Sequence, residues 1–83
     1  MDVLTNVNRV LDEVLSLGGR GLAFDHGTPL LGAIPELDSM AVVSLITTLE
    51  ERFGIGIGDD EVDGQTFATV GTLVALVESK LAD

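Results

Sequence analysis

Apolar residues recur at helical spacing in three separate segments, and this periodicity constrains the fold more than any other feature. In residues 2–17, 39–53 and 69–82 they fall at steps of three and four, which places them on one face of an α-helix. The three stripes are Val3, Val7, Val10, Leu11, Val14 and Leu15; Val42, Ile46, Leu49 and Phe53, widened by Val43 and Leu45; and Val70, Leu73, Val74, Val77 and Leu81. The sequence therefore predicts an all-α fold in which three amphipathic helices share one core.

The connections between these segments differ in character. Residues 18–38 hold five glycines and two prolines, a composition typical of a long loop, and Gly18 and Gly19 suit the end of the first helix. Gly54 suits the end of the second helix, and residues 59–63 have the acids that favour a short helix. We expect a single domain over residues 1–83, a small four-helix bundle of three main helices plus one short helix with a long first loop.

Composition narrows the function. The chain has 83 residues, no cysteine and a formal net charge of −10. One small core is all that this length supports, and neither disulfides nor thiolate metal sites are available. The acidic surface would repel nucleic acid and anionic lipid, and it would attract basic patches on protein partners. No apolar run approaches the roughly 20 residues of a membrane span and no targeting segment is visible, so we expect a soluble, cytoplasmic monomer.

No metal site is expected either. The acids of residues 59–63 lack the twelve-residue spacing of a calcium-binding EF-hand loop, and a solvated acidic face explains them better. His26 is the only histidine, and no second histidine or cysteine is present to share a metal with it.

The segment Glu36-Leu37-Asp38-Ser39-Met40 opens the second helical stripe. Asp38 is a good N-cap residue, able to accept a hydrogen bond from the N–H of Met40 or Ala41. Ser39 would then be the first helical residue, with its hydroxyl at the positive end of the helix dipole. A phosphate ester on that oxygen would be favoured there. An ordinary capped helix start would have the same residues.

Catalysis by Ser39 itself is not expected. A nucleophilic serine needs a base within reach and an oxyanion hole. The only histidine lies in the glycine-rich loop, and nothing in its spacing brings it to Ser39. A serine displayed at an acidic helix start without a catalytic partner makes more sense as the substrate of another enzyme than as an active-site residue.

The chain resembles the acyl carrier proteins, small acidic four-helix domains with a serine at the start of the second helix. The resemblance covers nearly the whole chain and is strongest from Leu31 to Leu81. The segments that carry it are Leu31-Gly32-Ala33, Leu37-Asp38-Ser39-Met40, Leu49-Glu50-Glu51-Arg52-Phe53, Ile57-Gly58-Asp59-Asp60-Glu61-Val62 and Phe67-Ala68-Thr69-Val70-Gly71-Thr72-Leu73.

This resemblance implies a cofactor and a set of partners. Ser39 would carry a 4′-phosphopantetheine arm, installed from coenzyme A by a separate phosphopantetheinyl transferase (a holo-acyl-carrier-protein synthase). The terminal thiol of the arm would hold acyl intermediates as thioesters for acyl-loading ligases and for synthase or transferase enzymes with basic patches. The candidate partner-recognition residues are Asp38, Met40, Glu50 and Glu51.

The family also shelters acyl chains among its helices. By position, the candidate lining residues are Val43, Ile46, Ile57, Val62 and Leu76, each of which could equally be an ordinary core residue.

The sequence departs from family members that serve fatty acid synthesis, which often have acids along the early second helix. Here those places hold Ala41, Ser44, Thr47 and Thr48. We therefore expect a role in a specialised lipid or secondary-metabolite pathway. Two alternatives stay open: an aminoacyl carrier of the D-alanyl type, which the Asp-Ser-Met form also resembles, and a non-carrier acidic helical module that docks a protein partner.

Overall fold

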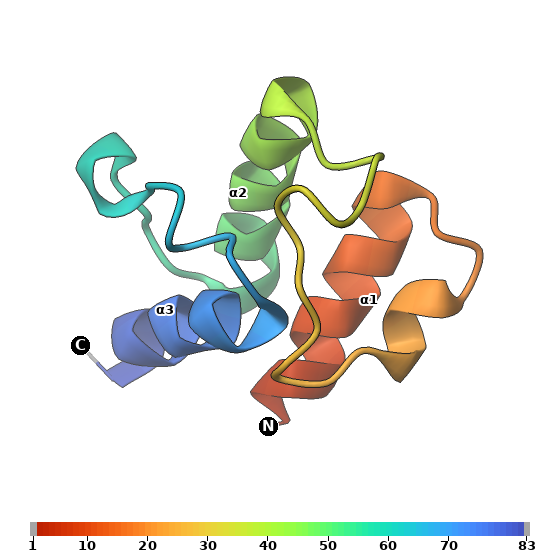
Figure 1. The fold of residues 1–83 in the computed structure, drawn as a ribbon. Helices are drawn as coiled ribbons and strands as arrows, with labels where there is room; N and C mark the ends of the chain where they lie inside the picture. The colour runs from red at the N-terminus through yellow and green to blue at the C-terminus, as the bar shows by residue number, and fades with distance from the viewer. Residues whose placement is uncertain (1, 83) are drawn as a thin grey trace.

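A computed structural model describes residues 2–82 of the chain, and it confirms the all-α class. These residues form α1 (Val3–Leu15), α2 (Ser39–Phe53) and α3 (Val70–Ala82), with two short 3-10 turns, η1 (Arg20–Ala23) and η2 (Asp59–Glu61). Figure 1 shows α1 and α2 running side by side, with α3 crossing near one end of both. α1 packs against both other helices, whereas α2 and α3 touch less extensively. The predicted short helix at 59–63 is thus a single 3-10 turn.

α1 ends earlier than the glycines suggest. Its last residue is Leu15, and Ser16 adopts the left-handed conformation, with φ 54°. The Ser16 and Leu17 N–H groups both donate to the Asp12 carbonyl, which closes the last turn. Gly18, which the sequence marks as the end of the helix, therefore lies beyond it. A serine rarely takes positive φ, so this earlier stop has no signal in the sequence.

One hydrophobic core joins the three helices to the long loop. Its fully buried members are Val7, Val10, Leu11, Leu30, Leu45, Leu49, Val70, Leu73 and Val77. On α2 the buried residues are Leu45, Leu49 and Phe53, all of which belong to the predicted stripe as widened by Leu45. Ile46 is only half-buried and Val43 is 65% exposed. These two residues face a cavity that is described below.

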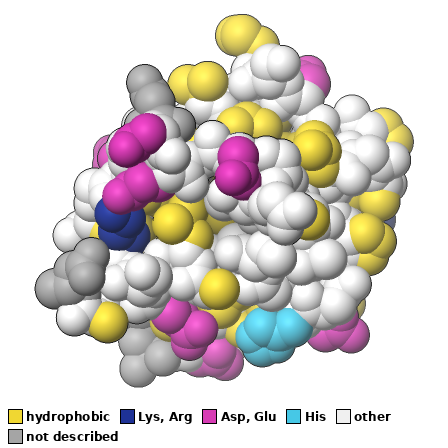
Figure 2. Space-filling model, turned by 60° about the vertical axis from the view of Figure 1, so that its left-hand side comes forward, with side chains coloured by type: hydrophobic (Ala, Val, Ile, Leu, Met, Phe, Trp, Pro, Cys, Tyr) yellow, Lys and Arg dark blue, Asp and Glu magenta, His cyan; other side chains and the backbone are white. Residues whose placement is uncertain are grey.

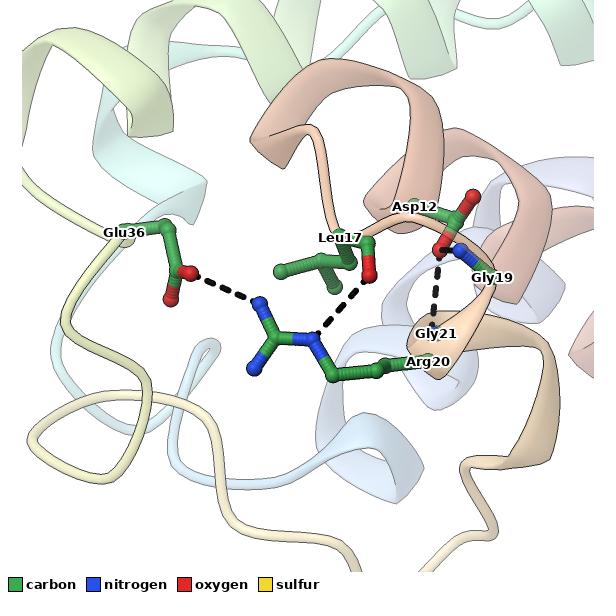
Figure 3. Close-up of polar contacts among 6 residues, drawn as sticks. All are labelled: Asp12, Leu17, Gly19, Arg20, Gly21 and Glu36. Atoms are coloured by element: carbon green, nitrogen blue, oxygen red, sulfur yellow. Dashed lines mark hydrogen bonds and ion pairs between the residues drawn. The ribbon is translucent and has the colours of Figure 1, made fainter.

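The carboxylate of Asp12 holds the start of the loop after α1. It accepts hydrogen bonds from the Gly19 and Gly21 N–H groups at 2.8 and 3.1 Å (Figure 3). A Cβ atom at Gly21 would lie 2.9 Å from the Asp12 Cβ, so this close approach requires glycine. The glycine-rich segment therefore folds around a carboxylate of the chain itself.

Arg20 connects this turn to the segment that precedes α2. Its Nε donates to the Leu17 carbonyl at 3.0 Å, and its Nη2 lies 2.7 Å from the Glu36 carboxylate (Figure 3). The guanidinium beside Glu36 holds the pKa of that carboxyl below its usual range. The end of α1 and the approach to α2 are thereby linked.

The long loop is also tied to the start of α3. Pro29 and Thr69 form an isolated β-bridge. The Val70 and Gly71 N–H groups donate to loop carbonyls at 2.9 and 2.8 Å, the second carbonyl being that of His26. These bonds satisfy two of the free N–H groups in the first turn of α3. The loop is therefore an ordered part of the fold.

Candidate functional site: the start of α2 and the adjoining cavity

Ser39 is exposed and is the first residue of α2. Asp38 caps the helix: its Oδ1 accepts from the Ala41 N–H at 2.8 Å, and its carbonyl accepts from the Val42 N–H at 2.9 Å. Asp38 is extended, with φ −121° and ψ −175°, as N-cap residues usually are. The chain before the cap is anchored by Leu37, which is buried. The hydroxyl of Ser39 is thus presented at a firmly built helix N-terminus.

A cavity of about 350 Å³ adjoins the helix that Ser39 begins. It is lined by Val42, Val43, Ile46, Thr47, Glu50, Ile57 and Val62. The structure therefore brings together four of the five residues that the sequence proposed for an acyl pocket.

The lining residues of α2 all lie on the face of the helix that Ser39 shares. They follow Ser39 by three, four, seven, eight and eleven positions, which are the steps that return to one side of an α-helix. With a rise of about 1.5 Å per residue, the cavity extends along α2 from about 4 to about 17 Å beyond Ser39. This spacing was visible in the sequence, and it is the signal that would have added Val42, Thr47 and Glu50 to the predicted lining.

The opposite wall of the cavity is the segment 55–62, which follows α2 and includes η2. Ile57 is buried there, and its N–H donates to the Glu50 carboxylate at 2.8 Å. Glu61 accepts a hydrogen bond from the Gly58 N–H at 3.1 Å and forms an ion pair with Lys80 of α3. The Lys80 ammonium, and then the Gly58 N–H, hold the pKa of Glu61 below its ordinary value.

Leu76, the fifth candidate, lies elsewhere. It lines a second, more open depression of about 390 Å³, together with Gln65, Thr66, Thr72, Ala75 and Ser79. The sequence places Leu76 on α3, but only the rotation of that helix decides which cavity it meets.

The candidate partner-recognition residues divide into two groups. Asp38, Met40 and Glu51 are exposed, and Met40 is the most exposed large apolar side chain described, at 79%. Glu50 is half-buried, lines the cavity and holds Ile57. Glu50 therefore has a structural role in the wall of the cavity. Figure 2 shows acidic side chains more widespread than basic ones on one face, with hydrophobic side chains exposed among them.

The structure separates Ser39 from the only histidine. The backbone of His26 bonds to Gly71 at the start of α3, and Figure 1 places that end of α3 far from the start of α2. Residues 2–82 contain no group of three or more histidine, cysteine or acidic side chains arranged to hold a metal ion. Among the helices of the same residues, none is long and apolar enough to cross a membrane.

Comparison with known proteins identifies the arrangement. Residues 36–77 match a family described as the phosphopantetheine attachment site. The chain is also similar to the solution NMR structure of a holo acyl carrier protein from Nitrosomonas europaea, with 49% identity, a TM-score of 0.92 and coverage of 100% of both chains. No curated protein matches the chain. Both matches agree with the serine that begins α2. The chain belongs to the acyl carrier protein family, whose members are not themselves enzymes and bear a covalently attached 4′-phosphopantetheine.

Proposed function

We propose that Ser39 is the residue that carries the arm and that the cavity beside α2 receives the acyl group. One observation carries this proposal: an exposed serine begins the helix whose same face, one turn later, lines an apolar cavity. An arm attached to Ser39 reaches the cavity by lying along the surface of α2, without crossing the core.

The residues around Ser39 fit a phosphodiester. The oxygen is exposed, so a transferase can reach it, and it lies at the positive end of the fifteen-residue helix α2. The Asp38 carboxylate is engaged by the Ala41 N–H and so is directed into the first turn of the helix. When attached, the arm supplies a terminal thiol that holds an acyl group as a thioester, sulfur chemistry that this cysteine-free chain lacks.

The lining of the cavity favours an acyl cargo over an aminoacyl one. Five of its seven residues are valine or isoleucine. Each methylene that leaves water for such a lining contributes about 0.8 kcal/mol, whereas a charged amine would lose hydration there. We therefore assign an acyl carrier role in place of the D-alanyl alternative.

The surface of α2 supports a specialised lipid or secondary-metabolite pathway. Ser44 and Thr47 are exposed on α2, so the residues that partner enzymes would meet there are neutral hydroxyls. We propose that residues 1–83 act as one carrier unit, a monomer. Its partners are a phosphopantetheinyl transferase and acyl-handling enzymes whose basic patches meet Asp38, Glu51 and the exposed Met40.

The test is direct modification. The purified protein is incubated with coenzyme A and a broad-specificity phosphopantetheinyl transferase and then weighed by intact-mass spectrometry. One added phosphopantetheine is expected on the wild type and on Ser44→Ala, which removes another exposed serine of α2. None is expected on Ser39→Ala. Folded wild type that gains no mass, or Ser39→Ala that gains it, would rule out the proposed attachment.

A further inference from the structure

Two parts of the chain form the walls of the cavity. One wall is the helix α2 itself, and the other is an irregular segment that contacts with α2 and α3 hold in place. This second wall is the segment 55–62, which contributes Ile57 and Val62 and contains Gly56 and Gly58, residues that allow a backbone to hinge. Because α2 and α3 touch less extensively than either touches α1, direct packing between them adds little to the position of this segment.

Two carboxylates hold that wall in place, one on α2 and one within the wall itself. Glu50 of α2 accepts the Ile57 N–H, and Glu61 within the wall accepts the Gly58 N–H and pairs with Lys80 of α3. The second contact attaches the wall to the last turns of α3, nineteen residues along the chain. Lys80 thus reaches across the gap between α3 and the cavity wall.

This ion pair is more enclosed than the others that the described residues form. The side chains of Lys80 and Glu61 are 19% and 33% exposed. Those of Arg20 and Glu36 are 64% and 36% exposed, and those of Arg52 and Glu13 are 38% and 65% exposed. Solvent screens an enclosed pair less, so the Lys80–Glu61 pair constrains its neighbours more than the exposed pairs do.

We propose that the Lys80–Glu61 ion pair is a positioning contact that sets the width of the cavity, and thereby the length of acyl chain that the carrier retains. This inference rests on the proposed function. With the ion pair formed, Ile57 and Val62 are already positioned beside α2. A short acyl chain therefore gains contacts with them without the cost of ordering the wall. A longer chain would fit only if the wall moved. Because the ion pair keeps the wall in place, the extra methylenes of such a chain stay in solvent.

The experiment uses holoprotein loaded with a series of straight acyl chains from butanoyl to tetradecanoyl. For wild type, Lys80→Met and Glu61→Gln, the midpoint of thermal unfolding is compared with that of each protein's own unacylated holo form. Arg52→Met is the matched control, because it breaks an ion pair between α2 and α1 away from the cavity. In the wild type the midpoint should rise with chain length and then level off.

Lys80→Met and Glu61→Gln should both reduce the gain for short chains and move the levelling-off to longer chains. Arg52→Met should keep the wild-type dependence on length. If Lys80→Met also keeps that dependence, the inference is wrong and the pair is merely structural.

A second measurement needs no loaded cargo. In the unacylated protein, Lys80→Met should raise hydrogen exchange at the Ile57 and Gly58 amides by up to about five-fold, the factor that corresponds to an ion pair of this kind. Unchanged exchange at both amides would overturn the inference even if loading succeeds. Failure of the arm to attach to Ser39 would instead overturn the proposed function, and the amide exchange would still decide whether the pair positions the wall.

Discussion

At the scale of single residues, Asp38 links the stability of α2 to the presentation of Ser39. Its side chain satisfies the Ala41 N–H and its carbonyl satisfies the Val42 N–H, so the first turn of α2 depends on it. Ser39 lies between the cap and the amides that the cap binds. The geometry of the proposed attachment site is therefore set by a neighbour that has no part in the chemistry.

Asp38→Ala should lower the free energy of unfolding by about 1 kcal/mol, since a helix cap of this kind contributes about 0.5–2 kcal/mol. Asp38→Asn should retain most of that stability, because asparagine caps nearly as well. Urea denaturation of the three proteins measures both effects. Equal stability of Asp38→Ala and wild type would show that the cap contributes nothing.

At the scale of elements, the long loop is fixed to the start of α3 by a close contact between the two backbones. A Cβ atom at Gly71 would lie 2.7 Å from the carbonyl oxygen of His26, which accepts the Gly71 N–H. Gly71→Ala should therefore displace the loop and lower the free energy of unfolding by about 1–3 kcal/mol, the usual cost of overpacking. A Cβ at Gly64 would meet no atom within 4 Å, so Gly64→Ala is the control and should be nearly neutral.

Amide exchange locates the change in Gly71→Ala, with faster exchange expected at Val70 and at the substituted residue itself. Exchange that stays slow there, together with wild-type stability, would mean that the loop can move aside without cost.

The tie between η2 and α3 should depend on pH. The pKa of Glu61 is lowered in the folded protein by Lys80 and the Gly58 N–H, so the folded state favours the ionised carboxylate. Its contribution to stability is thus present above the ordinary pKa of 4.5 and is lost as the pH falls through the lower pKa of the folded protein.

The stability difference between wild type and Lys80→Met should accordingly be constant above pH 4.5 and shrink below it. Urea denaturation at several pH values measures it. The comparison with a variant is needed because the pKa values of Asp2 and Glu36 are also lowered, by Thr5 and Arg20 respectively, and both act in the same pH range. A difference that grows on acidification would contradict the assignment.

At the scale of the whole molecule, a net charge of −10 should govern association with partners. The KM of a phosphopantetheinyl transferase for this protein should rise between low and physiological salt, because salt screens attraction between the acidic surface and a basic partner. Glu51→Gln should raise KM at low salt and have little effect at high salt. A KM independent of salt would point to the exposed Met40 and Val43 as the main contacts.

The sequence predicted what depends on local spacing. The three helices follow from apolar periodicity, and the cap at Asp38 follows from residue type and position, so both could be inferred without coordinates. Ser16 shows the limit, because a serine in the left-handed conformation gives no local signal and ends α1 before the glycines. The conformation of the long loop could not be read from the sequence, because its bridge from Pro29 to Thr69 joins residues far apart in the chain.

The same distinction applies to the candidate site: local spacing predicts part of it, and the rest depends on how distant segments pack. Ser39, Val43 and Ile46 share one face of α2, as helical spacing predicts, whereas Ile57 and Val62 were candidates only through the family resemblance. The dual position of Glu50, in the cavity wall and bound to the Ile57 N–H, depends on how the chain returns after Gly54. The second depression that holds Leu76 depends on the rotation of α3 against the rest of the fold. Neither can be read from one segment.

The central claim is that Ser39 and the cavity along α2 form one unit. The most direct measurement is NMR of the holoprotein loaded with a ¹³C-labelled octanoyl chain, observing transfer from the chain to assigned methyl groups. The account predicts contacts with Val43, Ile46, Ile57 and Val62, and none with Leu76. Contacts confined to Leu76 and its neighbours, or a loaded chain that touches no methyl group of the protein, would contradict it.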